Sequence, residues 1–412
     1  MRLTLNQQIF LGLFIGIGLG LLIPLVFGID SQVGKALLYI CQITGSLFVN
    51  ALKMILIPLV FLSISVGIAN LKAHNRMGAV WKVTLIYFIC STTLAIILGL
   101  AVMNVLKPGA GLTSKLFETE ISSAVVEHLT LSQFLESFLS QMFTNPVAAM
   151  AAGNVLPTVI FAIILGIALI VAQERAKHIQ SLLNEGFEII MQIVNWIMWL
   201  APYGIAGLIG KLVATQNLDL LGKLGFFIAI VIGTTLFHGI VTLPTILKIV
   251  TGISPLRFFS GMRESLITAF STSSSSATMP ITLRCVQENF KVDKSISGFV
   301  VPLGTTVNMD GTALYEAVAA LFVANLVGIE LNLIQQIIIF FMTMIASIGA
   351  PGIPSAGMVT MVMVLQSVGL PVEAIGILLP IDRPLDAIRT VVNVEGDAIC
   401  SLVVQKVTAA KG

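Results

Sequence analysis

Six charged residues gather between positions 381 and 397, in the segment IDRPLDAIRTVVNVEGD. They stand out because only 10% of the whole chain is charged and because the flanking segments, PVEAIGILLP and SLVV, are largely apolar. Residues three or four positions apart share one face of a helix, and the polar face predicted here consists of Asp382, Asp386, Arg389, Thr390, Asn393 and Asp397. Charged side chains inside an apolar span are costly and usually functional, so we interpret this face as one wall of a binding site.

The side chains of this face suit a ligand that carries charges of both signs. The planar guanidinium of Arg389 can bind a carboxylate through two hydrogen bonds. One turn earlier, the carboxylate of Asp386 can accept hydrogen bonds from an ammonium group. A molecule with an ammonium group and an additional negative charge fits this pair, so the segment predicts an acidic amino acid as ligand.

A second polar segment, NMDGTALYE at 308–316, offers oxygen ligands for a cation. Asn308, Asp310 and Asp397 supply amide and carboxylate oxygens, and the backbone of Gly304 supplies a carbonyl. Hard cations prefer ligands of this kind. The sequence Asn-Met-Asp-Gly usually forms a turn, but this copy lies within an apolar run. We therefore predict that it interrupts a membrane helix at a cation site.

The composition places these motifs in a membrane protein. Of the 412 residues, 57% are hydrophobic and the mean hydropathy is +1.01, whereas a soluble domain has about 25% charged residues. Between Arg2 and Asp30 the chain has no charged residue, which is enough for a first spanning helix that is retained rather than cleaved. No basic run indicates nucleic-acid binding, the four cysteines fit no metal or disulfide pattern, and we assign no role to the four histidines.

Apolar segments predict eight membrane-spanning helices. They lie near residues 8–28, 36–70, 79–106, 138–172, 187–209, 222–249, 297–327 and 371–405. Two further regions, 256–290 and 331–369, have apolar arms that are each too short to span the bilayer. Their centres, STSSSSATMP (271–280) and GAPGIPSAG (349–357), are rich in small and turn-forming residues, so we expect two helical hairpins that enter the membrane and turn back.

Corresponding polar motifs follow the two hairpins, which indicates an internal repeat. NMDGT follows the first hairpin and RTVVN interrupts the helix after the second. The hairpins enter from opposite sides in the predicted topology, so the repeat is inverted, and such paired interruptions mark binding sites in transporters. The serine-rich tip offers hydroxyls and a helix N-terminus to a carboxylate, and the glycines of the second tip allow its backbone to approach a ligand. Lysine and arginine lie mostly on one side of this topology, which puts both termini in the cytoplasm.

Four segments, STSSSSATMP, NMDGTALYEA, IGAPGIPSAG and LDAIRTVVNVEGD, resemble the signature segments of the dicarboxylate/amino acid:cation symporter family. That family includes excitatory amino acid transporters and bacterial and archaeal glutamate/aspartate transporters. The resemblance implies an all-α membrane protein with eight transmembrane helices, two re-entrant helical hairpins, inverted repeats and an elevator-type mechanism. It also implies a homotrimer, in which residues 1–78 and 108–215 form a scaffold while residues 79–107 and 216–412 form a moving transport domain.

The resemblance further implies the residues of each site. The substrate would contact Ser274, Ser275, Thr312, Asp386, Arg389, Thr390 and Asn393, together with the backbone of Ile353 and Gly357. One sodium ion would be bound by Gly304, Asn308, Asn393 and Asp397, a second by Thr306, Met309, Ser347, Ile348 and Ala350, and a third by Ser91, Thr92, Asn308 and Asp310 with the carbonyl of Phe88. Neither an organic cofactor nor an enzymatic activity is implied.

Two features depart from parts of this family. Archaeal members have an arginine where this chain has Ser273, and animal members have one where this chain has Ala387; the hypothesis is that Arg383, one turn before Asp386, supplies that charge here. Glu316 follows NMDGTALY, as in relatives that co-transport a proton. Burial of this glutamate disfavours its charged form, so we predict that it binds and releases a coupled proton.

The predicted function is import of glutamate or aspartate, coupled to Na⁺ and/or H⁺. The compact loops indicate the inner (plasma) membrane of a prokaryote. Four alternatives stay open: transport of C4-dicarboxylates, which Asp386 would repel; transport of a neutral amino acid, which would leave Arg389 unpaired; an ion channel; and an intramembrane enzyme, for which the sequence offers no nucleophile–base pair. The expected partners are an acidic amino acid, the lipid bilayer and further copies of the chain, without nucleic acid.

Overall fold

The computed structural model describes residues 5–69, 78–109, 140, 143–215, 218–350, 352 and 355–409, and all secondary structure among them is helical. This confirms the all-α prediction. Within these residues, four helical segments are long and apolar enough to cross a membrane, namely Gln7–Phe27, Ala79–Leu106, Gly222–Thr251 and Lys294–Val327. A bent pair, Lys177–Met198 with Ala201–Thr215, would make a fifth.

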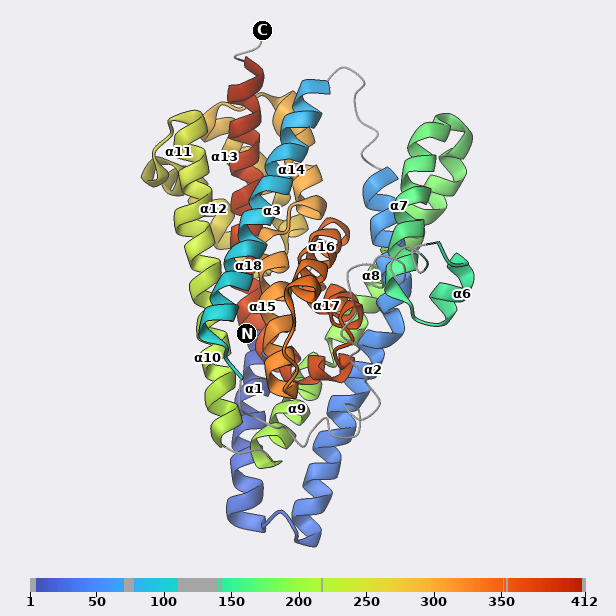
Figure 1. Ribbon diagram of the computed structural model, residues 1–412, viewed down its shortest axis with the longest axis vertical. Coiled ribbons are helices and arrows are strands. Elements are labelled where there is room, and N and C mark those ends of the chain that lie inside the picture. The colour runs from blue at the N-terminus through green and yellow to red at the C-terminus, as the bar shows by residue number, and fades with distance from the viewer. Residues whose placement is uncertain are drawn as a thin grey trace.

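One group of helices packs around the long helix α2. It contains α1 (Leu5–Leu22) with the π turn η1 (Ile23–Phe27), α2 (Gln32–Ala69), the short α6 (Pro146–Ala151), α7 (Val155–Ala172) with η4 (Gln173–Ala176), α8 (Lys177–Met198) and α9 (Ala201–Thr215). Helices α7, α8 and α9 all contact α2, and α1 packs along α9. Figure 1 shows α1, α9 and one end of α2 together at the bottom of the view, with α6 and α7 at the right.

A second group packs around α15 and α18. It contains α3 (Gly78–Leu106), α10 (Leu218–Phe237), the π turn η5 (His238–Thr242), α11 (Leu243–Thr251), α14 (Lys294–Val307), α15 (Asp310–Val327), η6 (Val372–Ala374) and α18 (Ile375–Ala409). Every residue of α15 except Asn325 is buried, because α3, α10, α16 (Leu333–Gly349), α17 (Ala356–Ser367) and α18 all pack against it. The two groups meet where α18 contacts α9 and where α16 and α17 contact α2.

The first predicted hairpin is formed by α12 (Pro255–Thr272) and α13 (Ser275–Phe290), which pack against each other. Ser254 caps the start of α12, with Pro255 in its first turn. The chain reverses at Ser273, which adopts a left-handed conformation with φ of 49°. Ser274 then caps α13, since its side chain accepts a hydrogen bond from the backbone N–H of Ala277 at 3.2 Å. The serine-rich tip is therefore an ordered two-residue turn between helices.

The second hairpin is formed by α16 (Leu333–Gly349) and α17 (Ala356–Ser367), which also pack against each other. A reciprocal capping box between Asn332 and Gln335 starts α16. At the tip, Ser355 has a left-handed conformation with φ of 60°, directly before α17 begins. Both regions that the sequence marks as hairpins are thus pairs of antiparallel helices.

The two polar motifs, NMDGT and RTVVN, differ in backbone conformation. NMDGT breaks the seventh predicted span, as expected, because α14 ends at Val307 and α15 begins at Asp310. RTVVN does not interrupt its helix, since α18 runs without a break from Ile375 to Ala409. The prediction of a second interruption was therefore wrong: this motif is polar in sequence but helical in backbone. Its side chains can be satisfied by neighbouring elements while the helix keeps its own hydrogen bonds.

The span predicted over 187–209 is bent in the structure. Helix α8 ends at Met198 and α9 begins at Ala201, and the two are bent by 50°. The prediction did not include the bend, although Pro202, just after the break at Trp199 and Leu200, was an available signal, because a proline lacks the N–H that would continue the preceding helix. Part of the predicted span at 138–172 lies outside the described residues, and its described part contains α6 and α7.

Candidate functional site

Arg389 stands at the centre of the charged face of α18. Its side chain is fully buried, and its Nη2 donates hydrogen bonds to Asp382 Oδ1 at 2.7 Å and to Asp386 Oδ1 at 2.8 Å. The guanidinium carbon lies 3.9 Å from the ring centroid of Tyr315 on α15, a cation–π arrangement. Its Nε and Nη1 have no hydrogen-bond partner among the described residues. A ligand carboxylate would find unused donors here.

Arg383 adds a second buried cation on the same face. It is 6% exposed, and its Nη1 lies 3.9 Å from Asp386 Oδ2. Within the described part of the chain its Nε and Nη1 make no hydrogen bond. Asp382, Arg383, Asp386 and Arg389 therefore form a cluster of two carboxylates and two guanidinium groups. The predicted face did not include Arg383, but the hypothesis placed this arginine near Asp386, where it lies.

The two hairpin tips meet above this cluster. The hydroxyl of Ser274 donates to the carbonyl of Gly352 at 2.7 Å, and the backbone N–H of Ser276 donates to the same carbonyl at 3.1 Å. The second tip also reaches α18, because the backbone N–H of Ser355 donates to Asp386 Oδ2 at 2.8 Å. Sequence reasoning missed Ser276, Gly352 and Ser355, although all three lie within the motifs that it marked.

The other predicted substrate residues lie close to these groups. The hydroxyl of Thr312 accepts a hydrogen bond from Asn393 Nδ2 at 3.4 Å. A methyl group at Gly357 would lie 2.9 Å from Thr312 Cγ2 and 3.9 Å from the Arg389 Nη atoms, so the second tip packs directly on both. The hydroxyl of Thr390 instead donates to the Asp386 carbonyl of its own helix at 2.8 Å. Ser275 is buried at the first position of α13, and Ile353 lies outside the described residues.

The residues predicted for the first cation converge. Asn308 Nδ2 donates to Asp397 Oδ1 at 2.9 Å and to the Asn393 carbonyl at 3.4 Å. A methyl group at Gly304 would lie 2.1 Å from Asp397 Oδ1, so glycine lets the backbone of α14 approach the carboxylate. Asn308 Oδ1 is buried without a partner in the described structure. A buried carboxylate with an amide as its neighbour and an unused amide oxygen is a donor set that fits an alkali cation.

The residues predicted for the third cation also converge, around Asp310. Its Oδ1 accepts hydrogen bonds from Thr92 at 2.6 Å and from Ser91 at 3.3 Å, and Ser91 also donates to the Phe88 carbonyl at 3.2 Å. His238 of η5 brings its Nε2 to 3.2 Å from Asp310 Oδ2. The sequence analysis assigned no role to this histidine, and its position inside an apolar helix was the available signal.

The residues predicted for the second cation are placed less closely. Met309 and Ala350 share a small buried cluster with Ala356. The hydroxyls of Thr306 and Ser347 donate to carbonyls of their own helices, at 3.1 Å and 2.8 Å. Ile348 lies next to Ser347 near the end of α16. The convergence of these five residues on one ion stays a prediction.

Glu316 lies one turn after Thr312 on α15 and is fully buried. The hydroxyl of Thr360 on α17 donates to Glu316 Oε1. Glu316 Oε2 has no partner among the described residues. This carboxyl group therefore joins α15 to the second arm of the second hairpin, a position from which its charge state can influence the hairpin.

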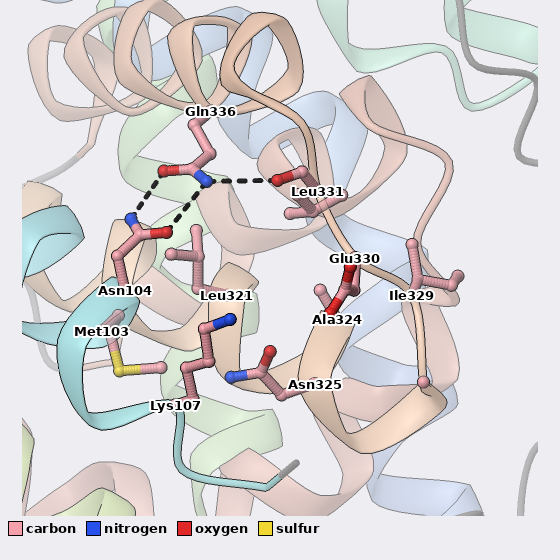
Figure 2. Close-up of a pocket in the computed structure, with 11 residues that line it drawn as sticks. Met103, Asn104, Lys107, Leu321, Ala324, Asn325, Ile329, Glu330, Leu331 and Gln336 are labelled. Atoms are coloured by element: carbon pink, nitrogen blue, oxygen red, sulfur yellow. Dashed lines mark hydrogen bonds between the residues drawn. The ribbon is translucent and has the colours of Figure 1, made fainter. Parts of the chain in front are cut away.

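A cavity of about 310 Å³ lies apart from these groups, where the ends of α3 and α15 meet the start of α16. Asn104 and Gln336 exchange two side-chain hydrogen bonds across it, at 2.7 Å and 3.0 Å (Figure 2). The side chains of Lys107 and Asn325 lie on the opposite side of the amide pair from α16 (Figure 2). This pair joins the base of the second hairpin to α3.

The described residues form apolar helices, and two helical hairpins meet at a cluster of buried charges. These are the features of a membrane transport protein. Residues 5–407 match the Sodium:dicarboxylate symporter family, and the chain belongs to this family. It is 34% identical to excitatory amino acid transporter 3 of Homo sapiens over an alignment of 457 positions, gaps included, which covers 99% of this chain and 87% of the relative. It is 33% identical to the proton/sodium-glutamate symport protein of Bacillus caldotenax over 411 aligned residues, covering 98% and 94%.

The family assignment settles the broad function. The chain is a multi-pass membrane protein and a cation-coupled symporter of a small molecule, and the family couples transport to Na⁺ and/or H⁺. It is a transporter rather than an enzyme, as predicted. The resemblance drawn from four sequence segments is confirmed over nearly the whole chain.

Proposed function

We propose that this symporter imports acidic amino acids, glutamate or aspartate, with Na⁺ and/or H⁺ as the coupling ions. The observation that carries the proposal is the position of Asp386 and Arg389, which lie together beneath both hairpin tips. The names of the two relatives, an excitatory amino acid transporter and a proton/sodium-glutamate symporter, support it.

Substrate binding is an exchange of ion pairs. In the structure, Asp386 is paired with Arg389, so neither charge is left unpaired in the interior. An acidic amino acid brings an ammonium group for Asp386 and a side-chain carboxylate for the free nitrogens of Arg389. Each buried charge then keeps a partner of opposite sign. A neutral amino acid would take Asp386 away from Arg389 and leave it with Asp382 alone, which is less favourable than the two partners it has in the structure.

The cations neutralise carboxylates that the substrate does not reach. Asp397 with Asn308, and Asp310 with Thr92 and Ser91, form two groups of buried oxygen atoms. A cation at each would offset the charge of one carboxylate in a low-dielectric surrounding. Because Asn393 donates to Thr312 and its carbonyl accepts from Asn308, the substrate side and the cation side share a residue. Cation binding would thereby organise the substrate site.

We propose an elevator mechanism with the architecture of the family resemblance. The helices of residues 79–107 and 216–412 pack around α15 and α18 and would move as the transport domain, while those of 1–78 and 108–215 would form the scaffold of a homotrimer. The eight spans, the entry of both hairpins into the membrane from opposite sides, and the inverted repeat belong to this proposal. So do the cytoplasmic termini and the location in the plasma membrane, which rest on the distribution of lysine and arginine.

A C4-dicarboxylate is the second candidate substrate, and Arg383 favours it. Arg383 Nη1 lies 3.9 Å from Asp386 Oδ2, and its Nε and Nη1 have no hydrogen-bond partner in the described structure. If Arg383 neutralises Asp386, the second carboxylate of succinate would no longer be repelled. The family name includes dicarboxylates. The two candidates differ in whether the substrate must carry an ammonium group.

The deciding experiment is uptake into proteoliposomes that contain the purified protein. Radiolabelled aspartate is supplied under an imposed Na⁺ gradient, an imposed pH gradient, or both, with glutamate, succinate and serine as competitors. We expect uptake that needs a cation gradient and that glutamate and aspartate inhibit far more strongly than succinate or serine. Stronger inhibition by succinate than by glutamate would establish that the substrate is a C4-dicarboxylate. Substrate-independent conductance without concentrative uptake would exclude the symport proposal.

A further inference from the structure

The cavity at the start of the second hairpin has no part in the proposed substrate and cation sites. Its volume is about 310 Å³, which is at the small end of the range for small-molecule pockets. Three of its lining side chains, Met103, Leu321 and Ala324, are apolar and buried. Its edge carries two exposed charged residues, Lys107 directly after α3 and Glu330 in the connection between α15 and α16. A molecule in this cavity would therefore meet an apolar surface together with charges of both signs.

The two charges share the cavity without pairing with each other. Among the described residues, every ion pair is formed by other side chains. In Figure 2 the side chain of Lys107 extends toward the side of the cavity on which Glu330 and Asn325 lie. A cation and an anion that line one small cavity but do not meet leave both charges open to a molecule placed between them.

The backbone holds Lys107 in place at the cavity. Lys107 has a left-handed conformation with φ of 41°, which is uncommon for a residue other than glycine and occurs often at binding sites. The next residue, Pro108, is fixed to α15, because its carbonyl accepts a hydrogen bond from Asn325 Nδ2 at 3.0 Å. A methyl group at Gly109 would lie 3.4 Å from Asn325 Cβ, so the chain stays in contact with α15. The position of the lysine therefore does not depend on its side chain alone.

The backbone on both sides of Glu330 is fixed as well. Helix α15 ends at Gly328, which has a left-handed φ of 74°, and the Ile329 N–H donates to the Ala324 carbonyl at 2.9 Å. Two residues after Glu330, the capping box of Asn332 starts α16. The connection between the two helices is short and anchored at each end, so Glu330 is held at the edge of the cavity.

The amide pair of Asn104 and Gln336 forms another wall of the cavity. Each side chain donates to the other, at 2.7 Å and 3.0 Å, and Gln336 Nε2 also donates to the Leu331 carbonyl at 3.2 Å. Because these amides already satisfy each other, the charges of Lys107 and Glu330 are the groups that would select a ligand.

We propose that this cavity is a second binding site, which takes a zwitterionic amino acid with a small apolar side chain. The carboxylate of the ligand pairs with Lys107 and its ammonium group pairs with Glu330. Its side chain contacts the apolar surface of Met103, Leu321 and Ala324. An inorganic anion or a metal ion would use only one of the two charges. A bound amino acid would join the ends of α3 and α15 at the start of the second hairpin.

This second site is separate from the proposed function, since none of its residues belongs to the substrate or cation sites. In the proposed topology α3 and α15 both end on the outer side of the membrane, so the cavity would be reached by external amino acids before any transport. Binding at the site is measured on the purified protein without transport, and it therefore does not depend on which substrate the protein carries.

The test measures binding of alanine to the purified full-length protein in detergent by saturation-transfer NMR. Alanine is a zwitterion without the side-chain carboxylate that the proposed function requires at Arg389. We expect wild type to bind it, and Lys107→Gln and Glu330→Gln each to need about fivefold more alanine for half-saturation, since an exposed ion pair is worth at most about 1 kcal/mol. N-acetylalanine, which lacks the ammonium group, and alaninamide, which lacks the carboxylate, should bind wild type more weakly by a similar factor. Absence of alanine binding, or equal binding of alanine and both analogues, would overturn the inference.

Charge reversal tests whether one ligand joins the two residues. Lys107→Glu and Glu330→Lys should each weaken alanine binding, whereas the two together should restore it, with the ligand in the opposite orientation. A double variant that binds no better than the single ones would refute the shared ligand. As controls, Lys248→Gln and Glu288→Gln remove exposed charges outside the cavity and should bind alanine as wild type does. Alanine binding that Lys107→Gln and Glu330→Gln retain in full would assign alanine to the central site and exclude the second one. Absence of aspartate uptake by wild type would instead contradict the proposed function.

Discussion

Replacement of Arg389 by lysine keeps the charge at this position but removes the fork and the plane of the guanidinium. In the structure, Arg389 Nη2 donates hydrogen bonds to both Asp382 and Asp386, and the guanidinium carbon lies 3.9 Å from the centroid of the Tyr315 ring. A lysine ammonium cannot reproduce both the paired hydrogen bonds and the stacking. The substitution therefore separates the effect of shape from the effect of charge.

The magnitude follows from the contacts that are lost. A hydrogen bond to a charged group contributes about 1.5–3 kcal/mol, and lysine loses at least one such bond to the substrate carboxylate. This corresponds to a rise of about 10- to 150-fold in the aspartate concentration that gives half-maximal uptake. Arg389→Gln also removes the charge and leaves Asp382 and Asp386 without their main partner, a change that costs about 3–5 kcal/mol for a buried pair. We expect this second variant to be less stable to heat as well as inactive.

The assay is the initial rate of aspartate uptake over graded concentrations, with thermal unfolding in detergent as a separate measure of stability. Arg263→Lys is the matched control, because Arg263 is exposed on α12, and it should behave as wild type. Wild-type apparent affinity for aspartate in Arg389→Lys would refute the assignment of the guanidinium to the side-chain carboxylate. An equal loss in the Arg263 control would show that the assay reports something other than binding.

Three other substitutions test separate parts of the site. Uptake by wild type should be stimulated at acidic pH, and Glu316→Gln should make uptake independent of pH. The amide keeps the contact with Thr360 but cannot bind and release a proton. Uptake by the variant that still depends on pH would contradict this role of Glu316. Arg383→Ala should increase the preference for aspartate over succinate by about tenfold or more, since a close buried charge pair is typically worth at least ~1.5 kcal/mol. If succinate competes equally well in the variant and in wild type, Arg383 does not determine substrate specificity. Gly304→Ala places a methyl group 2.1 Å from Asp397 Oδ1 and should abolish activation of uptake by Na⁺, with Gly298→Ala, where a methyl group meets no atom within 4 Å, as control.

The sequence predicted the charged face of α18 correctly because helical spacing alone puts Asp382, Asp386, Arg389 and Asn393 on one side. It could also predict both hairpins, since short apolar arms with small-residue centres admit few other structures in a membrane. The break at Asn308 and Met309 followed from polar residues inside an apolar run. These successes concern features that are local in the chain.

The failures concern contacts between elements that are distant in the chain. His238 and Asp310 are 72 residues apart, and only the packing of η5 beside α15 and α18 makes the histidine a neighbour of the aspartate. RTVVN was expected to interrupt α18. Instead, the side-chain oxygen of Asn393 accepts a hydrogen bond from the Gly311 N–H at 2.8 Å, and the helix continues. The bend between α8 and α9 is different, because Pro202 in the first turn of α9 marks it locally in the sequence.

Among the described residues, one peptide group joins the tips of the two hairpins. The carbonyl of Gly352 accepts both bonds from the first tip, one from the Ser274 hydroxyl and one from the Ser276 N–H, so both of its lone pairs are in use. Position 352 itself tolerates no side chain, because a methyl group there would lie 2.6 Å from Ser276 Oγ and from the Thr305 carbonyl. Two of the three groups in this contact, the Gly352 carbonyl and the Ser276 N–H, belong to the backbone, so a side-chain substitution leaves them in place. The Ser274 hydroxyl is the side chain among these three groups, so substitution at Ser274 is the direct way to change the strength of this contact between the tips.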